Sequence, residues 1–257
     1  MLKRCLRYGL SKFENAIRPL GYRISWVPPV ILSNPKAELP FELEFVIAHL
    51  LLQKDDIFFI QIGANDGISN DPLYKFVTRH NWSGILVEPI PEVYEILKEN
   101  YKNYPNLQFL NVAIGESDGF RTLYTVKIDA DTFKKAHQYS SFRKDVVAQQ
   151  TQWVPDIADR ITETRVRCIS LATLFAEAGG REIDILQIDT EGYDYEILKL
   201  VDFNQTRPSL ICYEHCNLTK TEMTAAAELL VEQGYRLTRD NLDTIAYRPV
   251  ASYGFRL

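Results

Sequence analysis

Short apolar runs alternate with amphipathic segments along most of this chain. The clearest run is residues 56–62 (D-I-F-F-I-Q-I), which is rich in Ile and Phe and typical of a buried parallel strand. Between such runs, apolar residues recur at helical spacing, as at Val93, Leu97 and Tyr101. The alternation predicts an α/β fold with a mostly parallel, doubly wound sheet. The other strands expected in it are 84–87, 108–112, 183–188 and 209–213.

The last part of the chain has a different pattern. Two apolar runs, 235–239 and 244–248, are separated by only a few residues. A connection this short permits an antiparallel hairpin but no parallel crossover, so we expect the sheet to finish with a terminal antiparallel hairpin. Before it, T-K-T-E at 219–222 has the pattern of a capping box and predicts the start of a helix. Asp71 followed by Pro72 predicts another helix start, with Pro72 as its first residue.

The pattern divides the chain into two parts. Residues 1–55 are expected to be an N-terminal helical extension and linker, and 56–257 the main domain, with an insertion at about 116–168. Residues 1–23 are basic and carry leucines at helical spacing, but they lack the continuous apolar stretch of a signal peptide. We favour a helix that packs on protein. The alternative is a helix lying on an anionic membrane surface.

Composition narrows the classes of function. A net charge of −5 argues against general nucleic-acid binding, which needs a basic footprint. The four cysteines are too sparse for a disulfide framework, which favours reduced thiols and a cytoplasmic location, peripheral at the membrane surface under the alternative above. No run approaches the ~20 apolar residues of a membrane span. The sequence gives no indication of the oligomeric state.

The chemistry is expected where strands end. In doubly wound sheets, ligands bind outside the carboxyl ends of the strands. Gly63-Ala64-Asn65-Asp66-Gly67 directly follows the first strand, and Glu88 ends the second, where its carboxylate can accept hydrogen bonds from the ribose of an adenosine cofactor. The loop lacks the G-x-G-x-x-G pattern of dinucleotide sites. The pairing therefore predicts an adenosine-type cofactor without a phosphate.

Five motifs in this order resemble the FkbM-type methyltransferases over residues 56–248: G-A-N-D-G, V-E-P-I-P, N-V-A-I-G, Q-I-D-T-E-G-Y-D-Y-E-I-L and Y-E-H. The resemblance implies a Rossmann-like class I methyltransferase fold and transfer of a methyl group from S-adenosylmethionine to oxygen, often on sugars or polyketide-like molecules. It also implies residue roles. The amino-acid end of the cofactor would be lined by Gly63, Asn65, Asp66 and Gly67. Glu88 would hold its ribose, and the segment from Asn111 to Ala113 would lie beside its adenine.

The next strand ends supply candidates for catalysis. A hydroxyl is a poor nucleophile unless its proton leaves during attack, so a base is needed as well as alignment. We predict that His215 or Asp189 takes that proton, with Glu191 beside them and Asp189 also at the cofactor. As an alternative, Asp189, Glu191 and Glu214 would hold Mg²⁺ or Ca²⁺ to lower the hydroxyl pKa. We favour the version without a metal.

The insertion is expected to contact the acceptor. Ser141 and Arg143, together with Glu214, are the predicted substrate-binding residues. Tyr139 and Trp153 would either stack on a sugar ring or, as we favour, pack within a lid. The expected partner is a small-molecule or glycan acceptor. Two other functions stay open: a non-catalytic partner protein that keeps the fold, and, less favoured, a nicotinamide-dependent oxidoreductase.

Overall fold

The computed structural model describes residues 27–34, 36, 38, 42–127, 139–152, 156–239 and 242–248. The helix predicted in residues 1–23, and Trp153, lie outside these ranges. Within them, no helix combines the length and the apolar character needed to cross a membrane.

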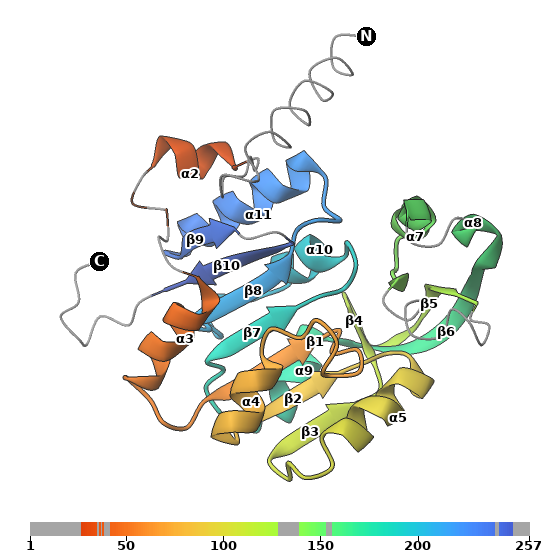
Figure 1. Ribbon diagram of the computed structural model, residues 1–257. Helices are drawn as coiled ribbons and strands as arrows, with labels where there is room; N and C mark the ends of the chain where they lie inside the picture. The colour runs from red at the N-terminus through yellow and green to blue at the C-terminus, as the bar shows by residue number, and fades with distance from the viewer. Residues whose placement is uncertain are drawn as a thin grey trace, which may run out of the picture.

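A seven-stranded sheet forms the centre of the protein (Figure 1), in the order β3-β2-β1-β7-β8-β10-β9. Neighbouring strands from β3 to β8 run parallel, whereas β10 runs antiparallel to both β8 and β9. The predicted mostly parallel, doubly wound sheet with a terminal antiparallel hairpin is therefore confirmed. The strands are β1 (Phe58–Ile62), β2 (Ser83–Val87), β3 (Leu107–Leu110), β7 (Ile185–Ile188), β8 (Leu210–Glu214), β9 (Arg236–Arg239) and β10 (Asp243–Tyr247).

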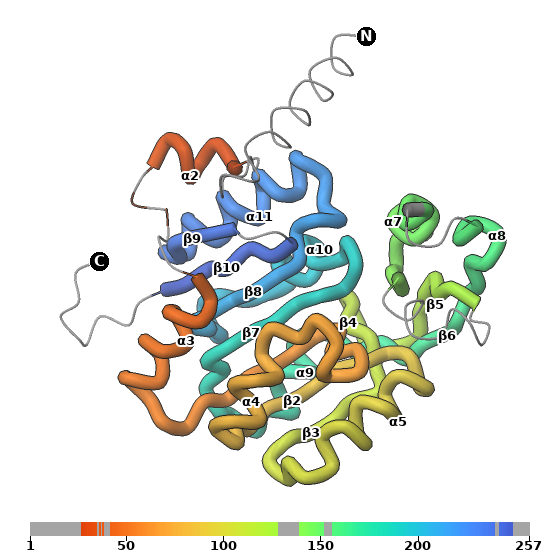
Figure 2. Tube along the Cα trace, viewed as in Figure 1, coloured from red at the N-terminus to blue at the C-terminus, as the bar shows by residue number. Residues whose placement is uncertain are grey.

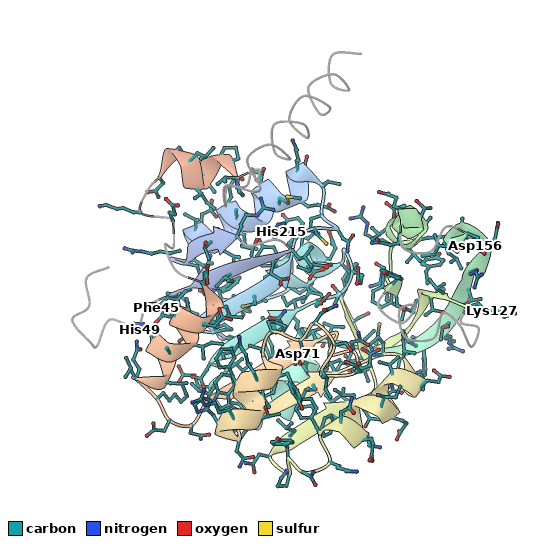
Figure 3. The ribbon with its side chains drawn as sticks, viewed as in Figure 1. Phe45, His49, Asp71, Lys127, Asp156 and His215 are labelled. Atoms are coloured by element: carbon teal, nitrogen blue, oxygen red, sulfur yellow. The ribbon has the colours of Figure 1, made fainter. Side chains whose placement is uncertain are left out.

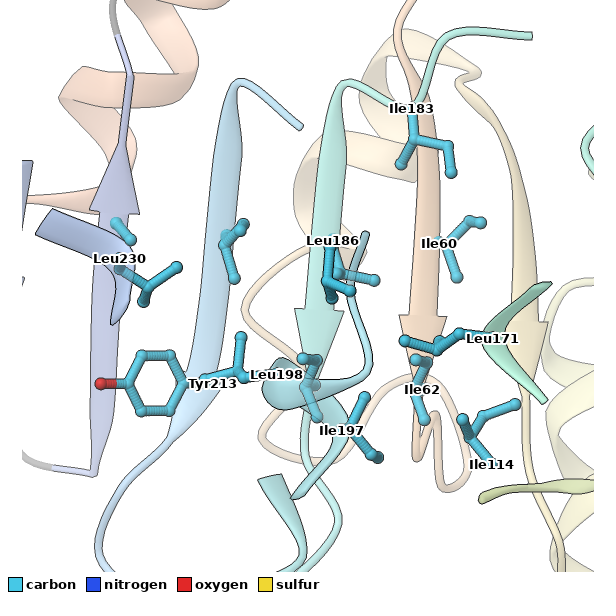
Figure 4. Close-up of a cluster of buried hydrophobic side chains, with 14 of the residues drawn as sticks. Ile60, Ile62, Ile114, Leu171, Ile183, Leu186, Ile197, Leu198, Tyr213 and Leu230 are labelled. Carbon is cyan, nitrogen blue, oxygen red and sulfur yellow. The ribbon is translucent and has the colours of Figure 1, made fainter. Parts of the chain in front are cut away.

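Helices cover both faces of this sheet because alternate side chains of each buried strand point to opposite faces. Ile60 and Ile62 pack into one core with residues of α9 (Leu171–Glu177), α10 (Asp194–Lys199) and α11 (Lys220–Glu232) (Figure 4). Phe59 faces the other core, with residues of α3 (Leu43–Leu51), α4 (Tyr74–His80) and α5 (Pro91–Asn100). Each fully buried aliphatic side chain stabilises the fold by about 1.5–3 kcal/mol.

Two of the predicted helix starts can be compared with the structure. Thr219 and Glu222 form the expected capping box at the start of α11. The other prediction needs correction, because α4 begins at Tyr74 rather than at Pro72. Asp71 does accept the backbone N–H groups of Leu73 and Tyr74, but the first carbonyl to accept a helical hydrogen bond is that of Leu73.

A smaller sheet in the order β4-β6-β5 stands beside the carboxyl ends of the central strands (Figures 1 and 2). Its long antiparallel pair consists of β5 and β6, and β4 pairs parallel with β6. This is the region predicted as an insertion; its boundaries stay a prediction. Its elements are β4 (Ala113–Gly115), β5 (Gly119–Val126), α7 (Lys144–Gln149), the 3₁₀ helix η4 (Gln150–Gln152), α8 (Ile157–Arg160) and β6 (Ile161–Ser170). The short helix α2 (Pro29–Ser33) packs against α11.

Candidate active site

A cavity of about 580 Å³ opens where the strands of the central sheet end. This volume lies in the range of small-molecule sites. The loops after β1, β2, β7 and β8 form one side of the cavity, and Tyr139, Ser140, Phe142 and Gln150 of the insertion form the other. The described residues that line it include six carboxyl groups and no Lys, Arg or His side chain. The cavity therefore favours a ligand that carries positive charge or hydrogen-bond donors.

The loop after β1 is held in a conformation that requires glycine. Gly63 has a φ of +81°, and a Cβ added there would lie 1.7 Å from the carbonyl oxygen of Asp189. Its N–H and that of Ala64 both donate to the carbonyl of Val87, at 2.9 Å each. The loop therefore lies tightly between the ends of β2 and β7, and Gly63 and Asn65 line the cavity as predicted for cofactor-binding residues.

We expect Gly63→Ala to destabilise the protein by about 3 kcal/mol or more, because its Cβ would overlap backbone that cannot move away. Gly179→Ala is the matched control, since Gly179 also has a positive φ (+62°) but open space around the added Cβ. For that variant we expect a loss of only about 1–2 kcal/mol from the left-handed backbone. Urea unfolding measures both values. Equal losses in the two variants would contradict the close packing described for the loop.

Three other predicted cofactor residues make contacts within the protein. The Asp66 carboxylate accepts the N–H groups of Ile68 and Ser69 and so shapes its own loop. A Cβ on Gly67 would lie 2.4 Å from the ring of Tyr101. The amide of Asn111 donates to the carbonyl of Glu88. None of Asp66, Gly67 and Asn111 is among the residues that line the cavity, whereas Ala113 is.

Glu88 lies buried at the end of β2, with 5 % of its surface exposed. One carboxylate oxygen accepts the N–H of Asn65 and the other that of Ile90, both at 2.9 Å. Burial raises the pKa of Glu88 to about 7, although the two N–H groups oppose the shift. Each oxygen keeps a second lone pair, so the carboxylate can accept further hydrogen bonds from a ligand in the cavity.

Two glutamines that the sequence analysis missed lie side by side on the sheet. Gln61 of β1 and Gln187 of β7 are register partners, are 3 % and 2 % exposed, and both line the cavity. The Oε1 atom of each has no hydrogen-bond donor. Asp71, labelled in Figure 3, also lines the cavity, and burial raises its pKa to about 6. The sequence did contain a signal, since a polar residue interrupts each of two buried apolar runs.

The loop after β7 brings acidic residues together. Asp189 lines the cavity, and no described residue donates a hydrogen bond to its carboxyl group. Burial, followed by the charges of Glu214 and Glu191, raises the pKa of Asp189 well above its ordinary value. The carboxylates of Asp189, Glu191 and Glu214 each offer an oxygen within 4.8 Å of the others. The structure therefore brings together all three of the acids predicted at this site.

Asp194 is fully buried behind this cluster. Its carboxylate accepts the hydroxyl of Thr190 and the N–H groups of Gly192 and Glu214. Asp194 thus ties the loop after β7 to the end of β8 and fixes where the three cavity-lining acids lie.

His215 lies away from the cavity, which counts against the predicted proton-accepting role. His215, labelled in Figure 3, is buried, with 5 % of its surface exposed. Its Nδ1 atom lies 3.1 Å from the hydroxyl of Thr244. The reason is the alternation of side chains along an extended strand: Glu214 faces the cavity, so the next side chain points away. A general base must come within about 2.6–3.2 Å of the proton it takes.

The predicted acceptor contacts of the insertion also have other partners. The Ser141 hydroxyl donates to the carbonyl of Glu191 at 2.7 Å, and Ser141 is buried. The guanidinium of Arg143 pairs with Glu222 at 3.0 Å and donates to the carbonyl of Gly192. Neither residue lines the cavity, whereas Glu214 does. Ser141 and Arg143 therefore hold the insertion against the loop after β7.

Comparison with known protein families gives one match. The model described as "Methyltransferase FkbM domain" matches residues 61–237, more than half of the chain. No curated protein matches the chain.

Among solved structures, the chain is similar to the methyltransferase FkbM from Methylobacillus flagellatus KT, with 14 % identity and a TM-score of 0.47. The match covers 83 % of this chain and 48 % of that one, so this chain spans about half its length. A human methyltransferase 10 domain containing protein shows 12 % identity and a TM-score of 0.41 over 94 % of this chain and 97 % of its own. A putative caffeoyl-CoA O-methyltransferase from Staphylococcus aureus shows 9 % identity and a TM-score of 0.39. That match covers 94 % of this chain and 100 % of its own.

Proposed function

We propose that this chain, which belongs to the methyltransferase FkbM domain family, is an S-adenosylmethionine-dependent O-methyltransferase that acts on a hydroxyl group of a small-molecule or glycan acceptor. One observation carries the proposal. The cavity at the strand ends places a half-buried carboxyl group, that of Asp189, beside the loop predicted to hold the cofactor, and no described residue donates a hydrogen bond to it.

The residues of the cavity fit this cofactor. An unpaired buried acceptor costs about 1–3 kcal/mol, and the Oε1 atoms of Gln61 and Gln187 are two such acceptors. S-adenosylmethionine carries an ammonium group and a sulfonium centre, which supplies an activated methyl group. An acceptor-rich, acidic wall without a basic side chain among the described lining residues suits both positive charges.

The other end of the cavity suits an adenosine. Glu88 offers carboxylate lone pairs for ribose hydroxyls, and Ala113 belongs to an apolar part of the wall that can pack against a planar base. The apolar neighbours of Ala113 in this wall are Val87, Ile90, Val112, Ile114 and Leu123.

Asp189 takes the acceptor proton in this proposal. A raised pKa brings a carboxylate closer to the working pH, where proton uptake is most effective. Glu191 and Glu214 flank it, accept hydrogen bonds from the acceptor, and through their negative charge make Asp189 more basic. The other residues of the cavity align the acceptor hydroxyl with the methyl group of the cofactor for an in-line displacement.

We expect turnover to survive removal of divalent cations by EDTA, within about twofold. The oxygens of Glu214 already accept hydrogen bonds from Cys216 and Asn217, and Glu191 also accepts one from Asn217, so a cation would have to displace protein donors. The assay compares methyl transfer after dialysis against EDTA with and without added Mg²⁺ or Ca²⁺. Loss of turnover that either cation restores would establish the metal-dependent alternative.

Transfer of labelled methyl from S-adenosylmethionine to a panel of hydroxyl compounds tests the proposal. The panel would contain free sugars, nucleotide sugars, lipid-linked glycans and polyketide-like alcohols. The expected product is a methyl ether, identified by mass spectrometry and NMR. Methylation of nitrogen or carbon would refute O-transfer. Cofactor binding without any product across the panel would favour the non-catalytic partner, and tight NADH binding would favour the oxidoreductase.

We also propose a cytoplasmic location. Its support is that Cys168 and Cys216 form no disulfide with a described residue, as expected in a reducing compartment.

A further inference from the structure

Asn217 makes contacts that the proposed reaction does not yet use. It lies in the loop between β8 and α11, three residues after Glu214. Its Nδ2 atom donates to Glu191 Oε2 at 2.7 Å and to Glu214 Oε2 at 2.8 Å. One side-chain amide nitrogen carries two hydrogens, so both are used, one on each carboxylate. Asn217 thus joins two acidic side chains that would otherwise repel each other.

These bonds have an electrostatic consequence. A donor that bonds to a carboxylate favours its ionised form. Burial is the main factor that raises the pKa of Glu191 and of Glu214, and the bond from Asn217 opposes the rise in both. The amide therefore favours the ionised form of both carboxylates and limits the rise in pKa that burial causes.

The other end of the amide reaches the insertion. Asn217 Oδ1 accepts a hydrogen bond from Gln150 Nε2 of η4 at 3.1 Å. Glu191 itself has a left-handed backbone, with φ of +52°, which is a strained conformation for a residue other than glycine. Ser141 of the insertion holds its carbonyl and Asn217 holds its side chain. The strained position is thus fixed from two sides.

We propose that Asn217 is a positioning residue that bridges Glu191 and Glu214 and aims both carboxylates at the acceptor, and that Gln150 fixes the orientation of the Asn217 amide from the insertion. This inference rests on the proposed function only for the identity of the ligand. The effect on the two carboxylates exists without any substrate.

The first test measures the carboxylates directly. Protein labelled with ¹³C at the glutamate carboxyl carbons is titrated by NMR, with the two signals assigned through Glu191→Gln and Glu214→Gln. In Asn217→Ala both pKa values should be higher than in the wild type, because two donors are lost. In Asn217→Asp they should be higher still, because an acceptor and a charge replace the donors. If the pKa values of both carboxylates in these variants equal those in the wild type, the proposal is overturned.

Two further variants serve as controls for this titration. Asn106→Ala, at an exposed asparagine that makes one long contact to the carbonyl of Asn81, should leave the curves unchanged. Gln150→Ala removes only the bond to Oδ1, and should shift the two pKa values upward less than Asn217→Ala does. A larger shift in Gln150→Ala than in Asn217→Ala would contradict the assigned roles.

The second test uses turnover of an acceptor found by the methyl-transfer assay. Ionised carboxylates hold the acceptor and make Asp189 more basic. KM of Asn217→Ala should therefore rise about tenfold at pH 6.5 but less than about threefold at pH 8.5, and kcat should fall at pH 6.5 but not at pH 8.5. A merely structural role would lower kcat equally at both pH values, and that result would overturn the proposal. If no acceptor is methylated while the NMR shifts occur, the O-methyltransferase function fails and the action of Asn217 on the carboxylates stands.

Discussion

Asp189→Asn is expected to reduce kcat by about a thousandfold while S-adenosylhomocysteine affinity stays within about tenfold of the wild type. Asparagine keeps the shape of the side chain but cannot take a proton. In the proposed site, the groups that bind the cofactor product are spread over the ends of β1 and β2, so its binding should largely survive. Single-turnover kinetics measure the first quantity and calorimetry the second.

Stability gives an independent check on this variant. The pKa of Asp189 is raised in the folded protein, so its ionised form costs stability above its unfolded pKa, and the cost grows as the pH rises through the folded pKa. The neutral asparagine avoids this cost. The Tm of Asp189→Asn at pH 8 should therefore equal or exceed that of the wild type, which separates a catalytic defect from misfolding. A lower Tm together with lost cofactor binding would contradict the assignment.

His215→Asn is the matched control for Asp189. Asparagine can keep a polar group near Thr244, where the structure places Nδ1 of His215. Because the ring does not line the cavity, kcat should fall by less than about fivefold. A loss of a thousandfold with unchanged stability would restore His215 as the base and remove Asp189 from that role.

Glu88→Ala is expected to weaken S-adenosylhomocysteine binding by about a hundredfold or more. Hydrogen bonds to a charged group contribute about 1.5–3 kcal/mol each, and in the proposed binding mode the carboxylate accepts two from the ribose. Calorimetry measures the loss. Glu92→Ala, which removes an exposed carboxyl group from the first turn of α5, is the control and should leave affinity unchanged. Equal affinity in the two variants would contradict the ribose assignment.

The pKa of Glu88 also predicts how S-adenosylhomocysteine binding depends on pH. Burial raises the pKa of Glu88 to about 7, and in the proposed binding mode the ionised form accepts the ribose hydroxyls best. Affinity should therefore fall by about tenfold between pH 8 and pH 6, as the carboxylate takes up a proton. Glu88→Gln does not titrate and should bind with a flat pH profile over this range. A profile as steep as that of the wild type would show that another group is responsible.

The sequence placed Gly63, Glu88, Asp189 and Glu214 correctly at the cavity for a simple reason. Each directly ends or follows a buried apolar strand, and parallel strands bring such positions to one edge of the sheet. The fold follows from the same pattern, because helical and extended periodicities alternate and the final connection is too short for a crossover.

Other parts of the site could not be predicted from the local sequence pattern, because they depend on side-chain orientation and on contacts between distant segments. His215 follows Glu214 in sequence, but the twofold alternation of a strand turns its ring to the opposite side. Arg143 and Ser141 belong to the insertion, and their partners Glu222 and Glu191 come from distant segments that only the tertiary structure brings near. Asn217 acts through three such contacts, which no spacing in the sequence indicates.

Titration of S-adenosylhomocysteine into the wild-type protein at pH 8 tests the central claim most directly. The residues of the cavity and the family of the chain both predict that this cofactor product binds. We predict a single site with micromolar affinity, a binding free energy of about −8 kcal/mol. Absence of binding at about 1 mM, where the free energy would be only about −4 kcal/mol, would contradict methyl transfer from this cofactor and leave only the fold.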